Sequence, residues 1–244
     1  MSSAEPIGSE RSEQRTDLIG LDARLATIRR PAPVLSRSEA DALTPRQSEI
    51  VDELTALIAD GFSHLTMADL AGKLGCSLRT LYGIAPNRDL LVLAACDRNL
   101  WMVGRTARKA VDLSAESSAL DSVRRYLLAA TEAVNSLTAA FTADMAAMPG
   151  GRDLDSAHRN YLVAVTAELL DLAVEQGEIE PVETLVVAHA MAGISQLFTA
   201  PDVIRTLPGT PKDASDTIVD LVLRGLTAPP AAPQAAPFNT RENS

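Results

Sequence analysis

Five cationic side chains between residues 79 and 109 have the type and spacing for one kind of chemistry, the binding of phosphate. They are Arg79, Arg88, Arg105, Arg108 and Lys109. The net charge of the chain, −10, argues against a nucleic-acid partner, but the acidity is unevenly distributed. Residues 1–43 carry a net charge of −1 and residues 44–109 of +1, whereas residues 110–244 carry −10. The middle segment is therefore close to neutral and can approach a polyanion.

Catalytic and metal-binding chemistry has little support in the residue pattern. The three histidines, His64, His158 and His189, are far apart, and none has a partner three or four residues later that would complete a zinc pattern. Asp153 and Asp155 precede His158, but we interpret this cluster as a solvated helix start rather than a metal site. The chain has no phosphate-binding glycine loop and no nucleophile motif. We therefore expect no metal, no cofactor and no enzymatic activity.

The segment from residue 65 to residue 91 must position the first of these cations, and it is typical of two short helices joined by a tight turn. Thr66 can cap the first helix, with Asp69 three residues later as a near capping box. Gly75 follows where a helix end needs a residue that tolerates positive φ. Ser77 then caps a second helix over residues 78–82. Because such short helices must dock on each other, the segment predicts a helix-turn-helix, whose second helix enters the major groove of DNA.

The rest of the chain is also predicted to be helical, so we expect an all-α fold: a three-helix helix-turn-helix domain followed by a helical domain. Thr44, Pro45 and Gln47 begin a first helix that Gly61 ends. Further helices are predicted over residues 88–113, 118–134, 136–148, 156–176, 181–200 and 214–226, with a loop over residues 202–212. Aromatic residues make up only 3% of the chain while Ala, Leu and Val abound, which favours helix over sheet.

These assignments divide the chain into four segments. Residues 1–42 are predicted to be a flexible extension, residues 43–90 a DNA-binding domain, residues 91–227 a helical domain and residues 228–244 a disordered tail. Within the extension, residues 17–30 have helical spacing. Two interpretations of this extension remain: a partly ordered tail, or a basic arm that reaches DNA. The arm would use Arg24, Arg29, Arg30 and Arg37.

The composition also bears on the compartment. No apolar run approaches the ~18 residues of a membrane span, and the first residues lack the apolar core of a signal peptide. Cys76 and Cys96 form neither a disulfide framework nor a metal set, and we expect both to be inert and buried. We therefore expect a cytoplasmic protein with no membrane partner.

Two predicted helices, over residues 181–200 and 214–226, are apolar around most of their circumference. A helix of that kind must be buried on all sides. One face can pack on its own domain and another on a second copy, which predicts a two-fold symmetric homodimer through these helices. A single large monomeric core is the alternative.

A series of residues between positions 61 and 90 follows a recognisable order. They are Gly61-Phe62, Thr66, Leu70-Ala71, Gly75, Ser77, Thr80-Leu81-Tyr82 and Arg88-Asp89-Leu90. This series resembles the DNA-binding domain of TetR-type transcriptional regulators. The family's His-Phe falls on Ile84-Ala85 here, and Arg88 replaces the family's lysine.

The resemblance implies a ligand-responsive regulator, more often a repressor, that binds double-stranded DNA as a homodimer. The expected DNA contacts are Thr66, Ser77, Leu78, Arg79, Thr80, Tyr82 and Arg88, whereas Leu81 is expected in the core. The resemblance also implies a pocket for a small apolar effector in the domain over residues 91–227, which is then an effector-binding and dimerisation domain. Its candidate ligand-binding residues are Trp101, Met102, Tyr126, Phe141, Met145, Met148 and Tyr161. The acidic balance mildly favours a neutral or cationic ligand.

Two other functions stay open at this point. One is a protein-interaction module with the same fold and a weak or lost DNA-binding face, which Ile84-Ala85 and the net charge favour. The other is an all-helical enzyme, which ranks last because the sequence offers no nucleophile–base pair and no metal set.

Overall fold

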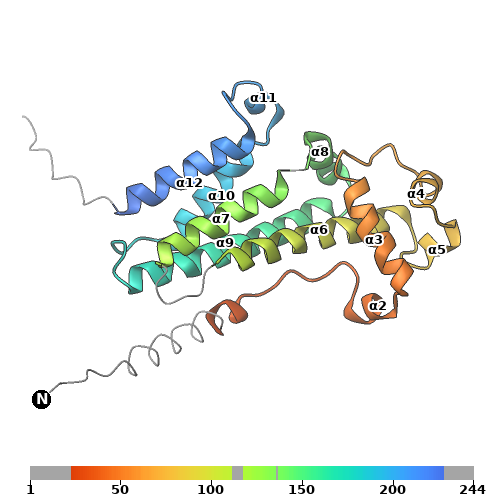
Figure 1. The fold of residues 1–244 in the computed structure, drawn as a ribbon, viewed down its shortest axis with the longest axis horizontal. Coiled ribbons are helices and arrows are strands. Elements are labelled where there is room, and N and C mark those ends of the chain that lie inside the picture. The colour runs from red at the N-terminus through yellow and green to blue at the C-terminus, as the bar shows by residue number, and fades with distance from the viewer. Residues whose placement is uncertain (1–22, 112–117, 136, 228–244) are drawn as a thin grey trace, which may run out of the picture.

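The computed structural model describes residues 23–111, 118–135 and 137–227, and every regular element within these ranges is an α-helix (Figure 1). The all-α prediction is therefore confirmed. The predicted disordered tail, residues 228–244, and residues 1–22 of the predicted extension lie outside the described residues.

Three helices make up the N-terminal unit of the fold. They are α3 (Pro45–Leu57), α4 (Met67–Lys73) and α5 (Leu78–Tyr82). The two predicted capping boxes form, because Thr44 exchanges hydrogen bonds with Gln47, and Thr66 with Asp69. The apolar sides of these helices meet in a first core, in which Phe62 is 1% exposed. This packing gives three short helices a stability that none has alone.

The long helix α6 (Arg88–Ala110) connects this unit to the C-terminal bundle (Figure 1). Its first turns pack in the first core and its later turns in a second core. The second core is formed mainly by α7 (Ala119–Val134), α9 (Gly151–Glu175), α10 (Thr184–Leu197) and α12 (Pro211–Thr227). A rigid α6 therefore belongs to both cores, and a change in its direction would move one core relative to the other.

The short helix α8 (Ala139–Ala147) lies between the bundle and the N-terminal unit, and α11 (Pro201–Ile204) precedes α12. Three apolar side chains of this region, Phe141, Met145 and Met148, are buried in the first core together with residues of α3 to α6. The boundary predicted at residue 90 therefore does not separate two independent cores.

Some helix boundaries differ from the predictions. The helix predicted from residue 156 begins at Gly151, α12 begins at Pro211 instead of residue 214, and the predicted loop contains α11. Gly151 has a physical reason to be glycine, because a Cβ atom there would lie 2.0 Å from the carbonyl oxygen of Met145. The Pro149-Gly150-Gly151 break therefore brings α8 and α9 into close backbone contact.

Residues 23–42 differ from the loose extension that was predicted for them, because they pack along the bundle. Residues 23–27 are helical, Leu25 is buried in the second core, and α2 (Arg37–Ala42) follows beside α3 (Figure 1). Arg24 pairs with Glu168 and Glu175 of α9. We call residues 24–36 the strap, since they run from the second core to the N-terminal unit.

Among the helices of the described ranges, none is both long enough and apolar enough to span a bilayer.

Candidate nucleic-acid interface and effector cavity

The turn between α4 and α5 sets the direction of α5. Gly75 has a φ of +58°, in the left-handed region that glycine adopts without strain. The Cys76 amide donates to the Ala71 carbonyl at 3.0 Å, which closes the turn. Ser77 then caps α5, because its hydroxyl oxygen accepts from the Thr80 amide at 3.1 Å. The two short helices are thus held at a fixed angle by backbone and capping hydrogen bonds.

α5 has a fully buried inner side and an exposed outer edge. Leu81 is 0% exposed, so the prediction that it lies in the core is confirmed. The exposed side chains are Ser77, Leu78, Arg79 and Tyr82, with Thr80 half-buried between them. Tyr82 is 54% exposed, which leaves its ring and hydroxyl open to a partner. The edge therefore offers hydroxyl groups and a guanidinium, which are groups that bind phosphates and base edges.

The other two expected DNA contacts are engaged within the protein. Thr66 is exposed, but its hydroxyl belongs to the capping box of α4. Arg88 turns inward: its Nε donates to the Leu65 carbonyl at 2.6 Å, a second nitrogen donates to the Phe62 carbonyl, and Nη1 pairs with Asp89 at 2.8 Å. In this structure the Arg88 guanidinium therefore holds the loop before α4, and its contact with a phosphate stays a prediction.

Ile84 and Ala85 occupy the positions where the family that residues 61–90 resemble has His-Phe. Both are buried in the first core, at 7% and 1% exposure. They anchor the end of α5 through apolar contacts and offer no polar group to a nucleic acid. DNA binding by this unit would therefore depend on the outer edge of α5 itself.

The remaining cations from the sequence pattern do not join that edge. Arg105 and Lys109 are exposed on the later turns of α6. Arg105 lies about 25 Å along the helix from Arg88, because an α-helix rises 1.5 Å per residue. Of the five candidate phosphate ligands, Arg79 alone lies on the exposed edge of α5.

A cavity in the C-terminal bundle has a volume of about 760 Å³, a size typical of ligand sites. Its lining residues come from α6, α7, α8, α9, α10 and the start of α12, and from the segments between them. Its apolar lining comes from Leu100, Val134, Leu137, Phe141, Met145 and Ile204. Its charged lining residues are Arg152, Asp155, Arg159 and Lys212.

Of the seven candidate ligand-binding residues, Phe141 and Met145 line this cavity. The other five lie elsewhere: Tyr126 is buried in the second core, Met148 in the first core, Met102 is 48% exposed, and Trp101 and Tyr161 pack against each other. The polar lining residues were not predicted from the sequence, because the candidates there were chosen for bulky apolar and aromatic side chains. The signal for them was the polar face of residues 152–159.

α8 is both a wall of the cavity and a support for the N-terminal unit. Asp144 accepts hydrogen bonds from the amides of Phe62 and Ser63 at 2.5 and 2.7 Å. The Thr138 amide, just before α8, donates to the Ala59 carbonyl at 3.1 Å. Burial opposes ionisation of Asp144, but the Ser63 and Phe62 amides outweigh it, so the pKa of this carboxyl lies below its ordinary value. A molecule in the cavity would therefore touch an element that is bonded to the loop before α4.

A buried polar pair that the sequence analysis missed joins α6 to α9. The Nε2 atom of His158 and the Oδ1 atom of Asp97 are 2.8 Å apart, with both side chains 8% exposed. The second carboxylate oxygen of Asp97 accepts from the amide of Val34 in the strap at 2.9 Å, and Trp101 packs edge-on against the imidazole. The predicted solvated helix start is therefore wrong for His158.

Within the described ranges, no group of three His, Cys, Asp or Glu side chains could hold a metal ion. Cys96 is fully buried, as predicted, and burial raises the pKa of its thiol to about 12. Cys76 is only half-buried, and burial raises the pKa of its thiol as well. Both thiols are therefore poor nucleophiles at neutral pH.

No protein-family model and no curated protein matches this chain. Solved structures match it in fold. A protein from Rhodococcus sp. described as a TetR-family transcriptional regulator gives a TM-score of 0.61 at 18% identity, over 76% of this chain and 100% of its own. A TetR-family regulator from Agrobacterium tumefaciens gives 0.57 at 15% identity, over 75% and 98%. The TetR-family regulator PfmR from Thermus thermophilus gives 0.52 at 20% identity, over 72% and 98%. Because these structures are covered almost completely, this chain carries segments in addition to the shared fold.

Proposed function

We propose that this chain, which has the fold of TetR-family transcriptional regulators, is a DNA-binding repressor that acts as a homodimer and responds to a small-molecule effector. The observation that carries the proposal is the outer edge of α5. Arg79 and Tyr82 are exposed on this edge, while Leu81 anchors the same short helix in the core. A helix fixed from inside with polar groups outside is suited to the major groove.

A dimer of this chain would use the apolar surface of α10 and α12. The exposed apolar side chains there are Leu185, Val186, Leu197 and Leu221. If the two-fold axis runs along the long dimension of the molecule, burying them against the same surface of a second copy would place two α5 helices at the same end of the dimer. Such helices read half-sites about one helical turn of DNA apart, which is about 34 Å.

An effector in the cavity would act through α8 and α6. The ligand would contact Phe141 and Met145 of α8, and α8 is bonded to the loop before α4 through Asp144. Ligand binding would therefore favour a different placement of the N-terminal unit on the bundle. Because the half-site spacing is fixed by DNA, a small displacement is enough to weaken the complex.

The test is the binding of the purified protein to DNA fragments from upstream of its own gene, measured by fluorescence anisotropy at low and moderate salt. We expect a complex whose affinity falls as salt rises, and a loss of about tenfold or more for Arg79→Ala and for Tyr82→Ala. Arg205→Ala is the matched control, because Arg205 is an exposed arginine that follows α11 and lies outside the helix-turn-helix. Equal affinity for all four proteins would contradict the proposal.

The competing function is a protein-interaction module with the same fold. It is favoured by Ile84 and Ala85, which put apolar groups where the resembling family has a histidine and a phenylalanine. That alternative predicts no complex with any upstream fragment, even at low salt, from a protein that is folded and dimeric.

A further inference from the structure

We propose that the cavity takes an amphipathic organic anion, with its acidic head at Arg152 and its hydrocarbon body against α8. This proposal names the chemical class of the effector, and its biological meaning rests on the proposed function as an effector-responsive regulator. Binding itself can be measured without DNA, so the two proposals can fail separately.

The cavity lining combines apolar and polar chemistry. Near α8, Leu137, Phe141 and Met145 supply apolar lining, which Thr138 and Thr142 interrupt. The lining residues of α9, α10 and the start of α12 are mainly polar: Arg152, Asp155, Ser156, Arg159, Ser195, Gln196, Thr199, Lys212 and Ser215. A ligand that fills this space needs an apolar part and a polar part.

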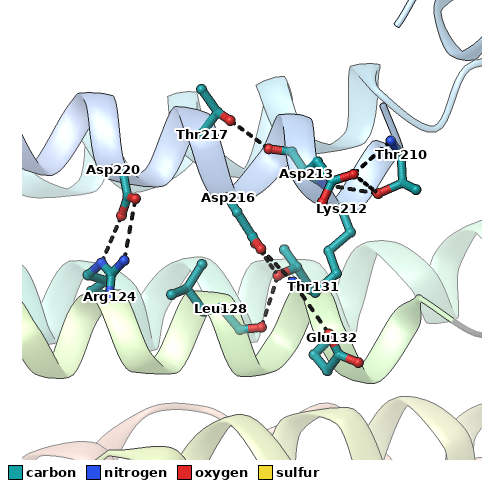
Figure 2. Close-up of polar contacts among 10 residues, drawn as sticks. All are labelled: Arg124, Leu128, Thr131, Glu132, Thr210, Lys212, Asp213, Asp216, Thr217 and Asp220. Atoms are coloured by element: carbon teal, nitrogen blue, oxygen red, sulfur yellow. Dashed lines mark hydrogen bonds and ion pairs between the residues drawn. The ribbon is translucent and has the colours of Figure 1, made fainter. Parts of the chain in front are cut away.

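Two of the three lining cations already have carboxylate partners. Arg159 pairs with Asp155 one turn earlier on α9, and its Nη1 donates to Gln196 of α10 at 2.6 Å. Lys212 lies between Asp216, at 2.5 Å, and Glu132, at 3.4 Å, as Figure 2 shows. These charges are compensated, and breaking their pairs to bind a ligand would cost much of what the ligand gained.

Arg152 differs from both. Its Nε donates to the Ala146 carbonyl at 2.8 Å, which fixes the side chain against the end of α8. Among the residues that the structure describes, no carboxylate lies within ion-pair distance of its guanidinium, whose other nitrogens remain available. Ser156, one turn later on the same face of α9, also lines the cavity. A carboxylate or phosphate can take two parallel hydrogen bonds from such a guanidinium and a third from the serine hydroxyl.

The charge of the lining also disfavours other ligand classes. The domain is acidic overall, which alone would favour a cation. The single lining carboxylate, Asp155, is already paired, so a cationic ligand would face Arg152 with no free carboxylate to compensate it. A neutral ligand would leave the Arg152 guanidinium without a charged partner. An amphipathic anion is the class that uses both the apolar lining and this guanidinium.

The experiment compares ligands that share one hydrocarbon chain and differ in the head group. Sodium octanoate, octyl phosphate, 1-octanol and octylamine are titrated into the full-length protein and followed by calorimetry, with thermal unfolding as a second readout. We expect octanoate, octyl phosphate or both to bind at least about tenfold more tightly than octanol, and octylamine to bind most weakly. The comparison of octanoate with octyl phosphate distinguishes a carboxylate site from a phosphate site.

The variants test the assigned head-group position. Arg152→Gln should remove the preference for the anions while leaving octanol binding unchanged, and Arg152→Lys should restore part of it. Arg105→Gln is the matched control, because Arg105 is exposed on α6 and does not line the cavity. Octylamine binding as tightly as octanoate, an unchanged preference in Arg152→Gln, or the absence of any anion binding would overturn the inference. Loss of anion binding in a protein that still binds DNA would leave the DNA-binding proposal intact.

Discussion

Asp97 connects three separate parts of the chain, namely α6, α9 and the strap. Its carboxylate meets His158 of α9 and accepts from the backbone of the strap, all within a site that excludes solvent. We predict that Asp97→Ala lowers the free energy of unfolding by about 3 kcal/mol, because it leaves a buried imidazole and a backbone amide without their partner. Urea denaturation followed by circular dichroism measures this change.

The matched control for this variant is Asp60→Ala, which removes an exposed carboxylate after α3. A loss for Asp97→Ala no larger than for Asp60→Ala would show that the pair contributes nothing to stability. Retained stability in Asp97→Asn would show that the hydrogen bonds matter more than the charge.

Asp144 gives the fold a contribution that depends on pH. The pKa of its carboxyl is lower in the fold than its ordinary value of 3.8. A lowered folded pKa means that the ionised group stabilises the protein above the unfolded pKa, and that this contribution is lost as the pH falls through the folded pKa. We predict that Asp144→Ala is less stable than the native chain at pH 7, and that the difference shrinks below about pH 4. Urea denaturation at a series of pH values tests this, and a difference that stays constant down to about pH 2 would contradict it.

Residue roles were predictable from sequence where the contact is local. Ser77 caps α5 and Leu81 faces the core because neighbours three or four residues away decide both features. The pairing of Asp97 with His158 joins positions 61 residues apart, and it depends on how two long helices cross. The inward hydrogen bonds of Arg88 were not predictable for the same reason, because their acceptors are carbonyl groups of a loop more than twenty residues earlier in the chain.

The strap packs on the rest of the fold, although the sequence predicted a flexible extension for residues 1–42. Arg24 fastens it to α9, Leu25 enters the second core at 4% exposure, and Val34 reaches the buried Asp97. We predict that Leu25→Ala costs about 2–3 kcal/mol of unfolding free energy, as for other buried leucines. Ala26→Gly is a neighbouring control at an exposed position, and thermal and urea unfolding give the measurement. A loss for Leu25→Ala as small as that for Ala26→Gly would mean that the strap does not contribute to the core.

Most helices were predictable from the sequence, but the start of α9 and the existence of the short helix α2 were not. The start of α9 was set five residues late because Pro149-Gly150-Gly151 is typical of a break, whereas Gly151 is already helical and small enough to pack on the Met145 carbonyl. α2 was not predicted because its six residues carry no apolar stripe and bury no side chain. Its capping box between Ser36 and Glu39 was the one local signal.

At the scale of the whole molecule, the N-terminal unit and the C-terminal bundle differ in charge. The segment that carries α5 is near neutral, whereas the segment from residue 110 onward carries the acidity of the chain. A polyanion is therefore repelled by the bundle and approaches the N-terminal unit, which lies at one end of the molecule (Figure 1). In the proposed complex, this charge distribution would therefore direct the N-terminal unit, and not the bundle, toward DNA.

The proposed dimer makes a prediction about the opposite part of the molecule, the outer surface of α10 and α12. Val186 is 64% exposed and Leu221 58% exposed, and such side chains gain free energy when a second copy covers them. Under two-fold symmetry Val186→Glu would place two carboxylates in one apolar interface, so we predict that the dissociation constant of the dimer rises by about a hundredfold or more. Sedimentation equilibrium over a range of protein concentrations measures this dissociation constant, with Thr106→Glu on α6 as the exposed control.

DNA affinity should fall together with the fraction of dimer, because a monomer would offer one α5 helix to a single half-site. A Val186→Glu protein that stays dimeric at nanomolar concentration would place the dimer interface elsewhere, and a native chain that stays monomeric at micromolar concentration would remove the dimer from the proposal.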